Sequence, residues 1–172
     1  MKRLSVPAIA LALFAAGCGS STSPSQTAPS KPTFTATILP ANETPPIANA
    51  ENVGSGTATI TFDLTNDASG NVTAATATFL VSMVGFPSST VINIAHIHTG
   101  ASGVPGPILV NTTLAPGDVT LSNGQATFTK ANINMTADTA TAIMNNPAGF
   151  YFNVHTAQNP GGVARGQLVR TQ

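Results

Sequence analysis

Apolar and polar residues alternate along most of the chain from residue 33 onward, in short runs separated by Gly, Pro, Asn and Asp. A period of two puts successive side chains on opposite faces of a strand, so it is typical of strands with one buried face. Nine runs are strand candidates: residues 33–39, 56–64, 72–83, 91–98, 107–112, 118–121, 125–130, 150–156 and 163–170. We expect about eight strands in an all-β, antiparallel Greek-key sandwich.

Two local patterns refine this expectation. The polar cluster at residues 66–71 lies between two alternating runs and predicts a β-hairpin. Residues 136–145 predict one short helix in a connection, with Thr136 as its N-cap and Asp138 in its first turn. Asn146-Pro147 is expected to end that helix.

The beginning of the chain follows a different pattern. After a basic start comes an apolar run at residues 6–16, too short to cross ~30 Å of hydrocarbon. Ala15-Ala16-Gly17-Cys18 then resembles the lipobox of bacterial lipoproteins, in which the cysteine is diacylated and becomes the mature N-terminus. This predicts a signal peptide at residues 1–17 and lipidation of Cys18; the alternative is an ordinary secretory signal with an incidental cysteine.

Residues 18–32 are rich in Ser, Thr and Pro and predict a flexible tether before a domain at residues 33–172. A lipid on Cys18 would make the membrane a partner and place the protein in the bacterial cell envelope. Gly19 follows the cysteine where lipoproteins retained in the inner membrane usually have Asp. We therefore expect the outer membrane or the cell surface.

The charge composition excludes one class of partner. Only 7% of residues are charged, and beyond residue 17 four Lys and Arg face six Asp and Glu. No basic patch is available to neutralise phosphates, so we expect no nucleic-acid binding. The sequence also has no Gly-x-Ser-x-Gly motif and no closely spaced pair of carboxylates, so it predicts no catalytic set.

The three histidines of the chain occupy two strand candidates. His96 and His98 alternate within one run, and His155 ends another. Alternate residues of a strand face the same side, so the first two imidazoles can converge on one ion. We predict a three-imidazole site for copper or zinc at His96, His98 and His155. The alternative is structural histidines that hydrogen-bond to backbone groups.

Two glycine-rich segments accompany the histidines. Residues 99–107 predict a tight turn between strands, because they lack the Lys-Ser/Thr and the following helix of a phosphate loop. The second segment predicts a structural motif. A turn is followed by a hydrogen-bonding arginine that could pair with Glu43 or Asp63 or reach toward the histidines, and then by a close backbone approach at a glycine. Its residues are Asn159, Pro160, Gly161, Gly162, Arg165 and Gly166.

These motifs together resemble the CHRD domain, named from chordin. The resemblance rests on Asn-Glu-Thr-Pro-Pro at 42–46, Ala-His-Ile-His-Thr-Gly at 95–100 with Gly-Pro at 106–107, Tyr-Phe-Asn-Val-His-Thr at 151–156, Asn-Pro-Gly-Gly at 159–162 and Arg-Gly-Gln-Leu at 165–168. It implies an extracellular β-sandwich. A fainter similarity links the three histidines to three of the four copper ligands of Cu/Zn superoxide dismutase, but no other histidine exists to complete that site.

Two functions follow as hypotheses. The first, which we prefer from the sequence, is a lipid-anchored, non-enzymatic binding or adhesion module for an unknown protein or glycan. It rests on the lipobox, the tether and the lack of a catalytic set. The alternative is a copper- or zinc-binding protein that uses the three histidines.

Overall fold

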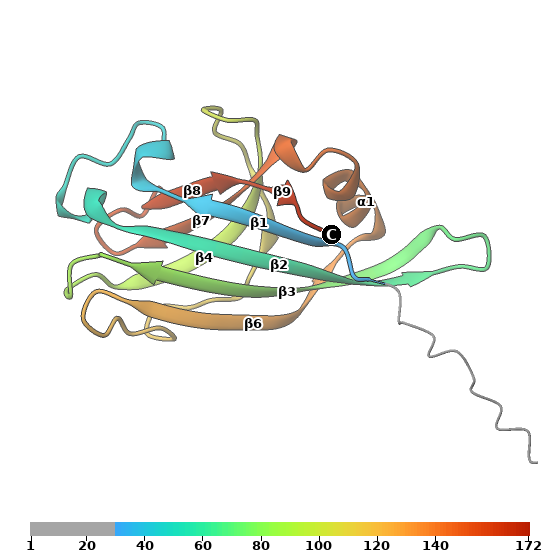
Figure 1. Cartoon of the computed structure of the whole chain (residues 1–172), viewed down its shortest axis with the longest axis horizontal. Helices are drawn as coiled ribbons and strands as arrows, with labels where there is room; N and C mark the ends of the chain where they lie inside the picture. Colours follow the sequence, from blue (N-terminus) through green and yellow to red (C-terminus); the bar gives the residue numbers. More distant parts are fainter. Residues whose placement is uncertain (1–29) are drawn as a thin grey trace, which may run out of the picture.

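In the computed structural model, which describes residues 30–172, nine strands form two antiparallel sheets (Figure 1). One sheet has the order β6-β3-β2-β1-β9 and consists of β1 (Thr33–Ile38), β2 (Ser55–Asn66), β3 (Val72–Val84), β6 (Ala126–Met135) and β9 (Val169–Arg170). The other has the order β5-β4-β7-β8 and consists of β4 (Ile92–Thr99), β5 (Ile108–Asn111), β7 (Phe150–Thr156) and β8 (Ala164–Gln167). The prediction of an antiparallel all-β sandwich is confirmed.

Several sequence-based predictions fall outside the described residues. They are the signal peptide at residues 1–17, the lipidation of Cys18 and the tether up to residue 29. Within residues 30–172, no helix is both long and apolar enough to cross a membrane.

The core lies between the two sheets. Every second residue is buried along β1, at residues 58–62 of β2 and at residues 75–83 of β3, as the alternation predicts. Phe79 of β3 and Phe152 of β7 stack across the sheets with ring centroids 5.8 Å apart. Each fully buried side chain of this kind contributes about 1.5–3 kcal/mol through removal of apolar surface from water. The core extends from Phe34 to Leu168, so residues 30–172 contain one complete core cluster.

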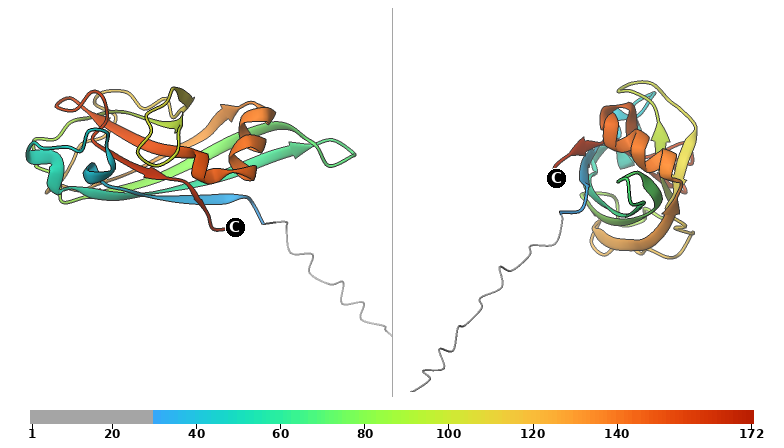
Figure 2. Two further views of the ribbon diagram at one scale, coloured as in Figure 1. Left: turned by 90° about the horizontal axis from the view of Figure 1, so that it is seen from above. Right: turned by 90° about the vertical axis from the view of Figure 1, so that its right-hand side faces the viewer.

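The predicted hairpin and helix are both present. Strands β2 and β3 pair along their length around the turn at residues 67–71. Helix α1 (Ala137–Asn145) begins after Thr136, whose hydroxyl accepts a hydrogen bond from the amide of Thr139 at 3.1 Å. The helix buries Ala140 and Ile143 in the core cluster and ends before Pro147. It is the short orange helix in both views of Figure 2.

Two strand predictions need correction. Residues 118–121 form only an isolated bridge, between Thr120 and Val91, because the Asp118 carboxylate accepts a hydrogen bond from the amide of Ala115 and closes a turn. Residues 163–170 form two strands in different sheets. They separate at Leu168, which is buried in the core between β8 and β9.

The outer face of the four-stranded sheet is covered, although a sandwich usually exposes such faces. All seven residues of β7 are buried. Residues 39–54, called the cap segment below, carry two 3-10 helices that the sequence did not predict, η1 (Pro40–Asn42) and η2 (Ala50–Val53). The Asn42 amide donates to the Arg165 carbonyl on β8 at 3.0 Å, and the Thr44 hydroxyl donates to the Gly103 carbonyl at 3.4 Å. The cap segment and the 100–107 loop thus enclose polar residues on this face.

Candidate metal centre

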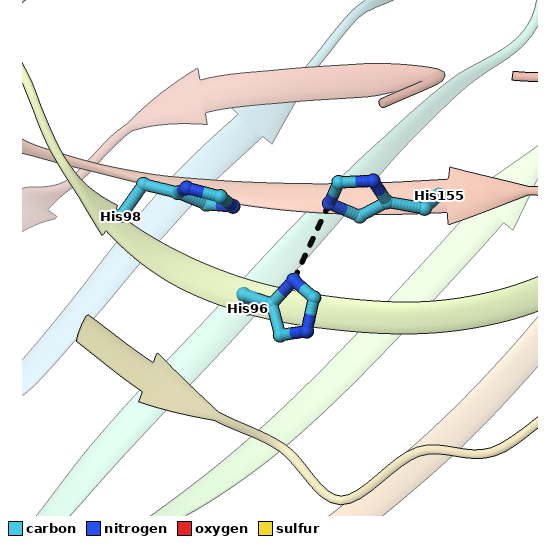
Figure 3. Close-up of side chains that lie close together, drawn as sticks. All are labelled: His96, His98 and His155. Carbon is cyan, nitrogen blue, oxygen red and sulfur yellow. Dashed lines mark hydrogen bonds between the residues drawn. The ribbon is translucent and has the colours of Figure 1, made fainter. Parts of the chain in front are cut away.

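Strands β4 and β7 bring the three histidines together on the covered face (Figure 3). His96 and His98 project from the same side of β4, and the register places His155 opposite Ile94. One nitrogen from each ring lies within 4.8 Å of the other two. Because metal–nitrogen bonds are ~2.0–2.1 Å long, each nitrogen needs to move by less than about 1 Å to bind a central ion.

Backbone carbonyls fix the orientation of two rings. Nδ1 of His98 lies 3.0 Å from the Gly106 oxygen, and Nδ1 of His155 lies 2.9 Å from the Pro160 oxygen. A carbonyl oxygen only accepts hydrogen bonds, so Nδ1 of both rings carries the hydrogen. The Nε2 lone pairs of these rings are then available as ligands, and Nε2 of His98 is buried without a hydrogen-bond partner.

His96 completes the set with Nδ1, whereas the other two histidines offer Nε2. Its Nδ1 lies 3.3 Å from Nε2 of His155, which is already an acceptor, so Nδ1 of His96 donates this hydrogen bond (Figure 3). A metal ion would take the place of that proton, which would move to Nε2 of His96. The ligand atoms are then Nδ1 of His96 and Nε2 of His98 and His155.

The three imidazoles are in the form that binds metals. Burial lowers the pKa of His96 to about 4, with a smaller contribution from His155 and His98. Burial also lowers the pKa of His98 and of His155, although their hydrogen bonds to carbonyls act in the opposite direction. Neutral rings need not lose a proton before binding an ion at pH 7, apart from the tautomer change in His96.

The 100–107 loop holds His98 from the side of β4. Besides accepting from His98, Gly106 donates its amide hydrogen to the Tyr151 hydroxyl at 3.2 Å. Tyr151 stacks on the His98 ring with centroids 4.9 Å apart and 3° between the planes. The predicted turn therefore also orients a ligand. Sequence reasoning missed Tyr151, although its spacing of four residues from His155 placed it on the same face of a strand.

The Asn-Pro-Gly-Gly segment holds His155. The Asn159 amide and the Thr156 hydroxyl both donate to Oε2 of Glu51, each at 2.6 Å. The Asn49 amide donates to Asn159 Oδ1 at 2.9 Å. These bonds fix the turn that presents the Pro160 carbonyl to His155. Glu51 was not foreseen, because it lies in an irregular segment where no periodicity indicates its burial.

Arg165 lies on β8 beside this cluster and is buried. Its guanidinium lies 4.1 Å from the centroid of the Tyr151 ring and donates to the Val104 carbonyl at 3.4 Å. Of the partners considered from sequence, Asp63 pairs with Lys31 instead. The expected close approach at Gly166 is present, since a Cβ there would lie 2.1 Å from the Thr37 oxygen.

Glu43 of the cap segment is the second buried carboxyl group on this face. Burial raises its pKa to about 7, against a smaller opposing effect of Arg165. Its Oε1 has no hydrogen-bond partner. The side chain lines a cleft of about 330 Å³ between residues 43–48 and 158–162, next to the turn that holds His155.

Comparison with known proteins gives a family for this chain. No curated protein and no solved structure matches it. The similarity to superoxide dismutase therefore stays a prediction. The family model of the CHRD domain matches residues 34–168, which include β2 to β8, β1 apart from its first residue, the cap segment and all three histidines. The chain belongs to the CHRD domain family.

Proposed function

We propose that the domain binds one transition-metal ion, copper or zinc, through His96, His98 and His155. The observation that carries the proposal is the convergence of three ring nitrogens within 4.8 Å of one another. Imidazole nitrogen suits copper and zinc, and the intrinsic order of affinities favours copper. The carbonyls of Gly106 and Pro160 act as the partners that usually orient metal-bound histidines.

The purely structural alternative accounts for less of the geometry. A structural buried histidine is expected to satisfy both ring nitrogens. In His98 only one of the two is satisfied. Nδ1 donates to the Gly106 carbonyl, but Nε2 is buried and has no hydrogen-bond partner. A metal ion at the centre of the cluster would satisfy this atom.

Metal retention tests the proposal directly. Residues 30–172 contain all three histidines and no cysteine, so no thiol competes for the ion. After incubation of the untagged domain with Cu(II) or Zn(II) and removal of excess metal, elemental analysis should give about one equivalent. The triple variant His96→Ala, His98→Ala, His155→Ala should retain none, and Asp138→Asn on α1 should match the wild type. Equal retention by the triple variant and the wild type would refute the site.

We further propose that a lipid on Cys18 anchors the protein in the bacterial envelope, at the outer membrane or cell surface. The lipobox resemblance and the tether support this. Palmitate labelling of the full chain should be lost in Cys18→Ser, and globomycin should block its processing. Labelling that survives the substitution would contradict the anchor. A protein or glycan ligand for the displayed domain stays a prediction.

A further inference from the structure

Asn153 lies at the centre of the polar face that carries the histidines. In the register of the sheet it is opposite His96 on β4 and opposite Arg165 on β8, and it is two residues from His155 on β7. Residues opposite each other, or two apart on one strand, project from the same face. Asn153 is 3% exposed, and its Oδ1 has no hydrogen-bond partner.

Glu43 reaches the same place from the cap segment. A Cβ built on Gly162 would lie 2.5 Å from Nδ2 and 2.9 Å from Oδ1 of Asn153, and 2.8 Å from Oε1 of Glu43. The two side chains therefore converge on one point beside the turn that holds His155. Glu43 is 8% exposed, and Gly162 and Glu43 both line the cleft.

Unpartnered polar atoms gather on this face. Among residues 30–172, four buried side-chain atoms lack a hydrogen-bond partner, and three of them are Nε2 of His98, Oδ1 of Asn153 and Oε1 of Glu43. Leaving one such atom without a partner costs about 1–3 kcal/mol. A metal ion satisfies the His98 nitrogen, but the two oxygens accept hydrogen bonds and require a donor.

A water molecule on the metal would supply both hydrogens. Sites with three protein ligands keep a fourth position for water. We propose that the metal of the histidine site carries an exchangeable water molecule, which Asn153 Oδ1 and Glu43 Oε1 hold by hydrogen bonds and which exchanges through the cleft. This inference rests on the proposed metal binding. Glu43 contributes a second effect, because its negative charge offsets part of the charge of a divalent ion in a buried site.

Water-proton relaxation of the copper-loaded domain tests this inference. Cu(II) is paramagnetic, so a coordinated water that exchanges with bulk solvent raises the relaxation rate of bulk water protons in proportion to bound copper. Residues 30–172 with one equivalent of Cu(II) should show this increase. Asn153→Leu and Glu43→Met each remove one of the two acceptor oxygens and should each reduce the copper-dependent increase at least twofold. Asp138→Asn, an exposed change on α1, should leave it unchanged.

The outcomes separate the two proposals. A domain that retains no copper refutes the metal site itself. A domain that retains copper without raising the relaxation rate overturns the water site alone, and so does an unchanged rate in Asn153→Leu. If Asn153→Leu fails to fold, the Glu43→Met measurement decides, because an unchanged rate there also overturns the inference.

Discussion

His98 and Gly106 are joined by a hydrogen bond of 3.0 Å from the imidazole Nδ1 to the carbonyl oxygen, across the loop between β4 and β5. The bond selects which nitrogen of His98 faces the other two histidines. It also depends on a close backbone contact, because a Cβ on Gly106 would lie 1.7 Å from the Thr99 oxygen. The turn that looks unspecific in the sequence therefore belongs to the site.

Gly106→Ala should weaken metal binding about 10–100-fold, the usual effect of losing a partner that orients a metal-bound histidine. The added methyl group must displace the loop and with it the carbonyl that holds His98. Competition against a chromogenic chelator would measure the affinity. Gly161→Ala is a matched control, because a Cβ added at that position would have no other atom within 4 Å. Equal affinity in both variants would show that the carbonyl does not orient the ligand.

The histidines should make the metal-free domain less stable in acid. Burial holds the pKa of His96 near 4 in the folded state, while an unfolded histidine has the ordinary value of 6.5. As the pH falls from 6.5 towards 4, the unfolded chain binds protons that the folded domain does not, so stability is lost. We expect His96 to account for about 1–3 kcal/mol of this loss.

Glu43 has the opposite effect on stability in acid, because its pKa is raised rather than lowered in the folded state. The effect of His96 should therefore be measured in a variant that lacks this carboxyl group. Urea unfolding of Glu43→Gln and of Glu43→Gln with His96→Leu should be compared at about pH 7 and pH 4. The stability of the first variant should fall more steeply in acid. Parallel pH profiles would contradict the burial of a neutral His96.

Glu43 itself should act with the opposite sign. Its pKa is raised from 4.5 to about 7, so its favourable contribution is present below pH 4.5 and is lost as the pH rises through 7. Relative to wild type, Glu43→Gln should gain about 1–2 kcal/mol between about pH 5 and pH 8. Thermal unfolding at both pH values would measure this gain. Asp138→Asn, an exposed change on α1, should show no such trend.

Glu51 should be important for the cap segment. Glu51→Ala leaves the buried Thr156 hydroxyl without its acceptor, and we expect a loss of about 1–3 kcal/mol for this group. The loss at the partly buried Asn159 amide should be smaller, because that amide also donates to Asn49 Oδ1. Glu51→Gln keeps an acceptor oxygen and should cost less. Chemical denaturation would rank the variants. If Glu51→Ala left the free energy of unfolding unchanged, the cap segment would not depend on this carboxylate.

The sequence was sufficient for the shared face of His96 and His98, because that follows from the period of a strand. It could not indicate which ring nitrogens converge. That selection depends on the carbonyls of Gly106 and Pro160, and loop backbone conformation leaves no periodic signal. Contacts of Glu43 and Glu51 join segments more than 100 residues apart, which local patterns do not report.

The position of β1 has a mechanical consequence. This strand begins at Thr33, next to the end of the chain, and leads at its far end directly into the cap segment (Figure 1). All six of its residues pair with β2, and Phe34 and Thr35 also pair with β9. A pull from the N-terminal side along the axis of β1 loads these bonds together, in shear, rather than one after another. Strand β1 would therefore resist a pulling force before that force reached the cap segment and the histidines.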